Sequence, residues 1–165
     1  MPEPVSRYHD CLRSSGATPH VSSALTSMCE ANQGAISGGN GGFAGGGTVV
    51  GVDGAGGVGI TGSSLSITNS GAISGGSGGS GQAEAIIFTG GTNTLELQSG
   101  YSITGNVVAF SAADTLALGG SGNASFDVST IGAGAQYQGF GIFQKTGTST
   151  WTLTGTTTAV TPWTI

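Results

Sequence analysis

The clearest chemical pattern in the sequence is a set of three glycines, Gly54, Gly56 and Gly59, in the spacing G-x-G-x-x-G. In dinucleotide-binding folds this spacing forms a phosphate loop, which needs a preceding strand, a following helix and an acid about 20 residues later. Residues 48–52 (TVVGV) could supply the strand, but residues 60–71 alternate at period two and residues 72–81 hold no acid. The sequence therefore predicts no nucleotide site. We expect these glycines to form a tight corner that requires positive φ.

Four glycine-rich stretches match the start of the calcium-binding nonapeptide G-G-x-G-x-D. The position that should hold the aspartate is occupied by Phe43, Thr61, Ser80 and Ala124. Calcium sites depend on carboxylate oxygens, and none of these side chains carries one. We therefore expect no calcium dependence in these repeats.

Hydrolytic chemistry has few candidate residues in the glycine-rich part of the chain. The only histidines, His9 and His20, lie near the N-terminus, so a Ser-His-Asp arrangement is excluded from residues 32–165. Glu96 and Asp114 could flank a glycosidic bond. We favour a structural interpretation, with Glu96 on an outward strand face and Asp114 at a turn. No catalytic residue is assigned, we expect no enzyme, and a polysaccharide-acting enzyme is the least favoured alternative.

A four-ligand zinc site can be written from His9, Cys11, His20 and Cys29, but the spacing H-x-C-x8-H-x8-C matches no usual pairing. Cys11 and Cys29 could instead form a disulfide in an oxidising compartment or remain free thiols. We expect no metal and no cofactor.

The composition excludes several classes of partner. Of the 165 residues, 34 are glycine, eight are acidic and only three are basic. Nucleic-acid binding and a polybasic membrane patch both need several Lys or Arg side chains. No apolar run approaches the roughly 20 residues that span a bilayer. The first residues also lack the basic and apolar regions of a signal peptide, so we expect the chain as written to carry no export signal of its own.

The composition changes near residue 32. Residues 1–31 hold both cysteines, both histidines and both arginines but only one glycine, Gly16. In this segment Thr18 suits a helix N-cap, Pro19 suits the first turn, and the apolar residues that follow lie at helical spacing. We therefore predict an atypical N-terminal segment, 1–31, with a short helix at about 19–30, followed by a repeat region, 32–165.

The second segment repeats itself. Residues 32–42 (NQGAISGGNGG) recur 37 residues later as 69–79 (NSGAISGGSGG), and residues 94–97 (TLEL) recur 21 residues later as 115–118 (TLAL). Apolar and polar residues alternate within each burst, which is typical of half-buried strands. Repeats with strand signals alone are typical of a solenoid in which like residues stack between coils. We predict an all-β parallel β-helix, with an antiparallel sandwich as the alternative.

Several strings resemble the passenger domains of bacterial autotransporters: residues 69–75 (NSGAISG), 88–97 (FTGGTNTLEL), 102–107 (SITGNV), 114–120 (DTLALGG) and 139–155 (GFGIFQKTGTSTWTLTG). The last string resembles their passenger-associated transport repeat. The matching positions, for which the resemblance implies a structural role, are Gly139, Phe140, Lys145, Thr146, Gly147, Trp151, Leu153 and Gly155.

The resemblance implies a right-handed β-helix that a C-terminal barrel carries to the surface of a Gram-negative bacterium, with roles in adhesion or host contact and no catalysis. On this basis we expect a fragment of a passenger, without signal peptide or barrel, that is displayed at the cell surface in the intact parent protein. The alternative is a module that binds glycan or protein through outward residues such as Tyr137 and Trp151. We also expect self-association through the exposed coil end.

Overall fold

The computed structural model of the chain describes residues 12–14, 25–26, 29–42 and 52–165. Within these ranges the structure is almost entirely β, with nineteen short strands and a single 3-10 turn, η1 (Val128–Thr130). All the strand pairs are parallel except one hairpin. The prediction of an all-β fold is confirmed.

The largest sheet contains seven parallel strands in the order β1-β3-β6-β11-β14-β17-β19. Their bounds are Leu12–Ser14 (β1), Cys29–Asn32 (β3), Ser66–Asn69 (β6), Thr94–Leu97 (β11), Thr115–Leu118 (β14), Ile142–Lys145 (β17) and Trp163–Thr164 (β19). Strand order follows chain order, so each strand pairs with the equivalent strand of the next coil.

Three smaller sheets follow the same rule. One has the order β16-β13-β10-β5-β2, one is β12-β7-β4, and one is β15-β18. Their bounds are Leu25–Thr26 (β2), Ala35–Ser37 (β4), Ile60–Ser63 (β5), Ala72–Ser74 (β7), Ile86–Gly90 (β10), Ser102–Thr104 (β12), Val107–Val108 (β13), Ala124–Asp127 (β15), Tyr137–Gln138 (β16) and Trp151–Thr154 (β18). The antiparallel hairpin joins Ser77–Gly78 (β8) to Gly81–Gln82 (β9).

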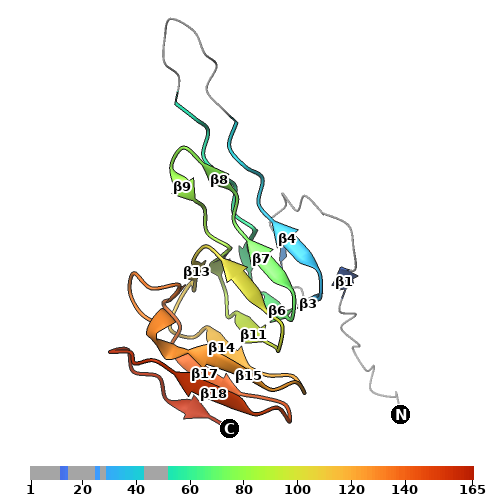
Figure 1. The fold of residues 1–165 in the computed structure, drawn as a ribbon, viewed down its shortest axis with the longest axis vertical. Coiled ribbons are helices and arrows are strands. Elements are labelled where there is room, and N and C mark those ends of the chain that lie inside the picture. Colours follow the sequence, from blue (N-terminus) through green and yellow to red (C-terminus); the bar gives the residue numbers. More distant parts are fainter. Residues whose placement is uncertain (1–11, 15–24, 27–28, 43–51) are drawn as a thin grey trace, which may run out of the picture.

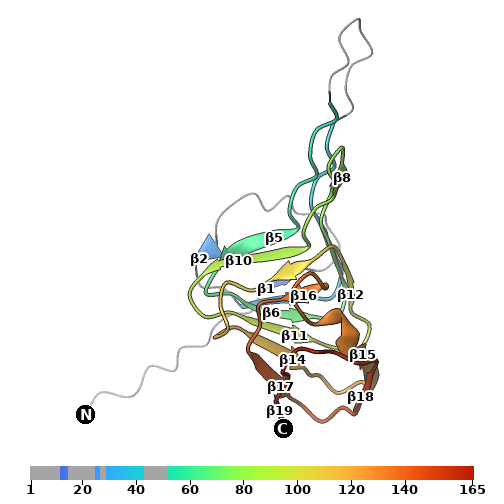
Figure 2. The same ribbon diagram turned by 90° about the vertical axis from the view of Figure 1, so that its left-hand side faces the viewer.

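The strands stack as successive coils of a parallel β-helix (Figures 1 and 2). The register between coils reproduces both sequence repeats. Ala35–Ser37 pairs in register with Ala72–Ser74, 37 residues later, and Thr94–Leu97 pairs with Thr115–Leu118, 21 residues later. These pairings confirm the predicted solenoid over the antiparallel sandwich.

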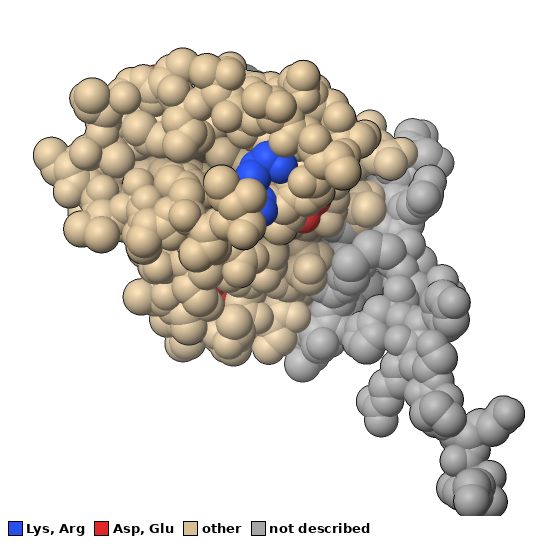
Figure 3. Space-filling view, turned by 90° about the horizontal axis from the view of Figure 1, so that it is seen from below, with Lys and Arg blue, Asp and Glu red and all other residues tan. Residues whose placement is uncertain are grey.

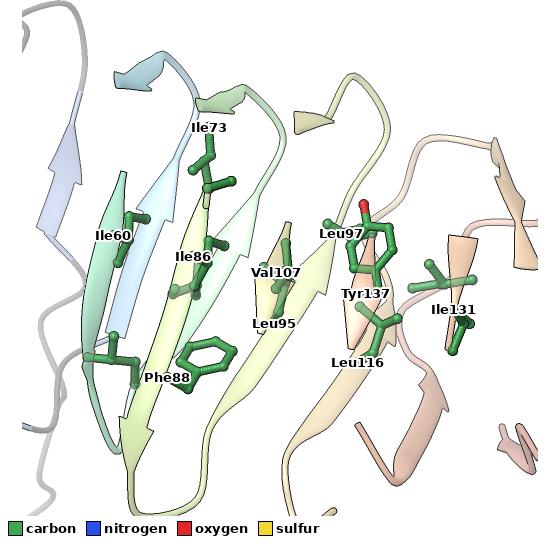
Figure 4. Packing of buried hydrophobic residues seen from close by; sticks show 14 of the residues in the cluster. Ile60, Ile73, Ile86, Phe88, Leu95, Leu97, Val107, Leu116, Ile131 and Tyr137 are labelled. Atoms are coloured by element: carbon green, nitrogen blue, oxygen red, sulfur yellow. The ribbon is translucent and has the colours of Figure 1, made fainter. Parts of the chain in front are cut away.

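The core is a set of apolar rows that run from coil to coil through the interior (Figure 4). In the largest sheet the inward row continues from Ile67 to Leu95, Leu116 and Phe143, and ends at Trp163. The first four of these side chains are at most 1% exposed. Burying one side chain of this size contributes about 1.5–3 kcal/mol, so each coil depends on its neighbours for stability.

Three glycine-rich segments of the polypeptide leave the coils together and project from the body as an arm (Figure 1). We define this glycine arm as residues 38–42, 52–57 and 75–79. Six backbone hydrogen bonds of 2.7–3.0 Å join the three segments, one of them at Ser74, directly before the third segment. They are Gly38 N to Ser74 O, Gly41 N to Ser77 O, Gly54 N to Gly42 O, Gly57 N to Gly39 O, Gly76 N to Gly57 O, and Gly79 N to Gly54 O. In each segment the two backbone N–H donors are three residues apart, which is the period of a polyproline II helix.

Close packing explains why the arm requires glycine. A Cβ atom added to Gly56 would lie 2.1 Å from Gly76 O, and one added to Gly38 would lie 1.9 Å from Gly57 O. Collagen uses glycine where three chains meet for the same reason. Our expectation of a positive-φ corner at Gly54, Gly56 and Gly59 is wrong, because none of them is among the positive-φ glycines of the described residues.

The prediction of a helix at about 19–30 is wrong for the parts of this segment that the structure describes. Leu25–Thr26 forms strand β2, which pairs with β5, and Cys29–Asn32 forms strand β3, which pairs with β6. A helix of this length is marginal in water, whereas the neighbouring coil offers a complete backbone ladder to pair with. Residues 19–24 and 27–28 lie outside the described residues. Strand β3 crosses the boundary that we placed at residue 31.

The arm yields a matched test of this packing. We expect Gly56→Ala to lower the free energy of local opening of the arm by about 1–3 kcal/mol, because the new methyl group overlaps Gly76 O. Amide hydrogen exchange at Gly57 and Gly76 measures that free energy. The control is Gly42→Ala, where an added Cβ meets nothing within 4 Å. Equal protection in the two variants would contradict the packed arrangement.

Candidate functional site

The eight residues for which the sequence resembles a transport repeat lie together in the last described coils, on and around strands β17 and β18. Gly139 and Phe140 precede β17. Gly139 has φ of +80°, a conformation that favours glycine. The Phe140 ring packs edge-to-face on Phe88, with 6.2 Å between the ring centres. These two residues therefore direct the chain into β17 and anchor it to an earlier coil.

Lys145 occupies an inward position of β17. It pairs with Leu118, which in turn pairs with Leu97, so its side chain continues an apolar row. Its ammonium group donates hydrogen bonds to Thr146 O and, at 3.3 Å, to Gly147 O. The cation thus caps two carbonyl groups of the turn that follows the strand.

Thr146 connects this turn to a strand two coils earlier. Its hydroxyl donates to Glu96 Oε2 at 3.0 Å, and Gln98 Nε2 donates to Glu96 Oε1 at 2.6 Å. The contact passes over Gly119, where an added Cβ would lie 2.4 Å from Glu96 Cδ. Glu96 lies between the inward residues of β11, as expected for an outward strand position, but it is half-buried and hydrogen-bonded.

Gly147, Ser149 and Trp151 fix the turn between β17 and β18. Gly147 has φ of +64°, and a Cβ there would lie 2.4 Å from Gly120 O. The Trp151 indole Nε1 donates to Gly119 O at 3.0 Å and to the Ser149 hydroxyl at 3.2 Å, and that hydroxyl donates to Gly119 O at 3.0 Å. The turn is therefore held by side-chain bonds to the preceding coil.

The final two of the eight residues lie on and directly after strand β18. Leu153 on β18 is 45% exposed, and Gly155 adopts φ of +71°. A Cβ at Gly155 would lie 2.0 Å from Asp127 Oδ1. Hydrogen bonds from the Ser129 side chain and backbone hold the pKa of Asp127 below its usual value. Most of the eight residues therefore take part in turns, packing or hydrogen bonds, whereas Leu153 is largely exposed.

The two aromatic residues of the glycan-binding alternative differ in exposure. Tyr137 is 2% exposed and packs on Phe126 with 5.4 Å between ring centres, and burial raises its pKa. It lies in the core, so Tyr137 is not an outward residue of the kind that a glycan-binding or protein-binding surface needs. Trp151 is half-buried and stacks on Tyr101, whose pKa is raised by burial and by the Asp127 carboxylate.

Asp114 lies at a corner before β14, fully buried. Its Oδ1 accepts bonds from Asn93 N at 2.8 Å and Asn93 Nδ2 at 3.0 Å. Its Oδ2 accepts bonds from Phe110 N at 2.7 Å and Ser111 N at 3.4 Å. With both oxygens occupied and no exposure to solvent, this carboxylate cannot act with Glu96 on a polysaccharide.

The sequence reasoning missed the asparagines at the coil corners. Asn93 Oδ1 accepts a bond from Leu65 N at 2.9 Å, which extends the Asp114 network to a third coil. Asn32 and Asn69 stack in register, with a bond of 2.8 Å from Asn32 Nδ2 to Asn69 Oδ1. The signal was present in the sequence, because both asparagines begin the duplicated 11-residue string.

Within the part of the chain that the structure describes, three or more His, Cys, Asp or Glu side chains do not come together to hold a metal ion. His9, Cys11 and His20 of the zinc alternative lie outside the described residues, and only the backbone of Cys29 is described, in β3. The same described ranges contain no helix that is long and apolar enough to span a membrane.

Comparison with protein-family models, with curated proteins and with solved structures finds no match. The functional interpretation therefore depends on the geometry of the coils.

The corner carboxylate provides a stability test. We expect Asp114→Asn to lower the free energy of unfolding by about 1–3 kcal/mol, because an amide nitrogen would face backbone N–H donors in a buried site. Chemical denaturation measures the change. Asp127→Asn is the control, because Asp127 is exposed and asparagine also accepts the Ser129 N–H bond. An Asp114→Asn effect no larger than the control's would contradict the role of the network.

Proposed function

We propose that this chain is a structural segment of a surface-displayed passenger of the autotransporter type, built as a right-handed β-helix, without catalytic activity. Its role is to form a stiff stalk that carries other parts of the protein away from the cell. The intact parent protein is located at the cell surface or outside the cell.

The observation that supports this proposal is the arrangement of the eight residues for which the sequence resembles a transport repeat. They meet in the terminal coils and are used for packing, capping and turn formation: Lys145 and Thr146 bond the turn, and Trp151 bonds the preceding coil. These contacts join neighbouring coils to one another, as a stiff stalk requires. Parallel stacking also lets later coils add one at a time.

Neither alternative function has comparable support. The adhesin-module alternative named Tyr137 and Trp151 as contact residues, and Tyr137 is buried. The polysaccharide-acting alternative paired Glu96 with Asp114, whose carboxylate is saturated by N–H donors. The proposed stalk requires no exposed reactive side chain.

Surface display tests the proposal. The chain is fused between a secretion signal and a translocator barrel, and an epitope tag at its N-terminal end is probed on whole cells with antibody and protease. We expect the tag to be accessible. We expect Gly155→Ala to reduce display several-fold, because it combines positive φ with a Cβ that overlaps Asp127 Oδ1.

Gly134→Ala is the matched control, since Gly134 has φ of +80° and an added Cβ there meets nothing within 4 Å. It imposes similar backbone strain without the overlap, so its display should stay close to that of the parent chain. Retention of the parent fusion in the periplasm would overturn the proposal. The proposal would also be overturned if both variants were displayed equally although purified Gly155→Ala is less stable than the parent chain.

A further inference from the structure

Asn40, on the first segment of the glycine arm, is the only asparagine of the chain that is followed by glycine. Its side chain is exposed. An asparagine before a glycine is chemically reactive, because the glycine nitrogen can attack the side-chain carboxamide when no neighbouring Cβ obstructs the approach. After each of the other asparagines the next residue carries a Cβ. Sequence and exposure together therefore select one asparagine for this reaction.

One residue of the third arm segment, Ser77, bonds both groups that would react. Its carbonyl oxygen accepts the Gly41 N–H at 2.8 Å, and its own N–H donates to Asn40 Oδ1 at 2.9 Å. The glycine nitrogen must lose its proton before it attacks, and the carboxamide must turn toward that nitrogen. Both bonds to Ser77 oppose these steps, so the reaction requires local opening of the arm.

The closed arm also depends on the length of main chain between Gly38 and Gly41. The two nitrogens donate to Ser74 O and Ser77 O, which are likewise three residues apart in the third segment. A Cβ added to Gly41 would lie 1.8 Å from Gly54 O, so the second segment leaves this backbone little room to move. One extra main-chain atom between the two donors would therefore break at least one of these bonds.

We propose that Asn40 is a site of spontaneous deamidation, controlled by opening of the glycine arm. The Gly41 nitrogen gives its proton to water and attacks Asn40 Cγ. The Cγ–Nδ2 bond breaks and ammonia leaves after taking up a proton, which gives a cyclic succinimide. Water then adds to one of the two ring carbonyl groups and opens the ring to aspartate or isoaspartate, without any oxidant or reductant.

The isoaspartate product has one extra carbon in the main chain between Gly38 and Gly41, so it holds the arm open. The modification is therefore an irreversible switch of the arm from its bonded to its open state. It rests on the arm alone and is independent of the stalk function.

Deamidation is readily detected in this chain, because it adds one negative charge where charges are few. The sequence has eight acidic and three basic residues, and most of the surface seen from below is uncharged (Figure 3). Anion-exchange chromatography separates the product from the parent chain. Peptide mass mapping then locates the modified residue and distinguishes aspartate from isoaspartate by fragmentation.

The first test compares the folded chain with the chain denatured in guanidinium chloride, both at mildly alkaline pH. We expect Asn40 to deamidate about tenfold or more slowly in the folded chain, because only the open fraction of the arm reacts. Asn123 is exposed and precedes Ala124, so it is the internal control and should react more slowly than Asn40 in the denatured chain. Equal rates at Asn40 in the two conditions, or a denatured rate no higher than that of Asn123, would overturn the proposal.

A variant that opens the arm provides the second test. We expect Gly56→Ala to raise the rate at Asn40 in the folded chain about fivefold or more, because its methyl group would lie 2.1 Å from Gly76 O. Gly42→Ala is the control, since an added Cβ there meets nothing within 4 Å, and rates in denaturant correct for its position beside the site. Faster amide exchange at Gly57 in Gly56→Ala without faster deamidation would contradict control by the arm.

Asn40→Asp separates the added charge from the longer main chain. Its carboxylate still accepts the Ser77 N–H, and its backbone keeps the normal length. We expect amide exchange at Gly41 to match that of the parent chain, whereas the purified isoaspartate form should exchange about tenfold faster. Equal exchange in Asn40→Asp and the isoaspartate form would overturn the proposed switch.

Discussion

The structure depends on the stacking of like side chains between successive coils in one parallel register. The row from Ile67 through Leu95, Leu116 and Phe143 shows the constraint, because each member is buried only when the next coil is in place. Backbone ladders between coils set the spacing, and the apolar rows supply the free energy. A change of one residue in register would turn each row outward, so register and stability cannot be separated.

Where glycine replaces apolar residues, backbone hydrogen bonds maintain the association between coils. In the glycine arm, three segments without a side-chain core are joined by a backbone hydrogen bond at every third residue. Examples are the bonds from Gly41 N to Ser77 O and from Gly57 N to Gly39 O. At the corners, buried polar side chains take over, as in the bonds between Asn93 and Asp114. The molecule thus uses apolar stacking in its body, backbone bonding in its arm and polar networks at its turns.

Much of the fold could be predicted from the sequence, because residues that pair between coils of a solenoid occur at equivalent positions of repeated sequences. The pairing of Ala35–Ser37 with Ala72–Ser74 follows directly from the duplicated string. The arm could not be predicted, because it joins three distant segments through backbone atoms that carry no sequence signal. Local helical spacing at residues 19–30 was misleading, since β2 and β3 gain more from ladder pairing. The resemblance drew attention to residues 139–155, but the burial of Tyr137 could be seen only in the structure.

Contacts between methyl groups of stacked coils report directly on the register between the coils. Nuclear Overhauser measurements on methyl-labelled chain should connect Ile36 with Ile73 and Leu95 with Leu116, since these pairs lie in register in neighbouring coils. In-register parallel stacking gives both contacts, together with the interstrand pattern of parallel strands. Close Hα–Hα contacts typical of antiparallel pairs in these segments, or no contact at either offset, would contradict it.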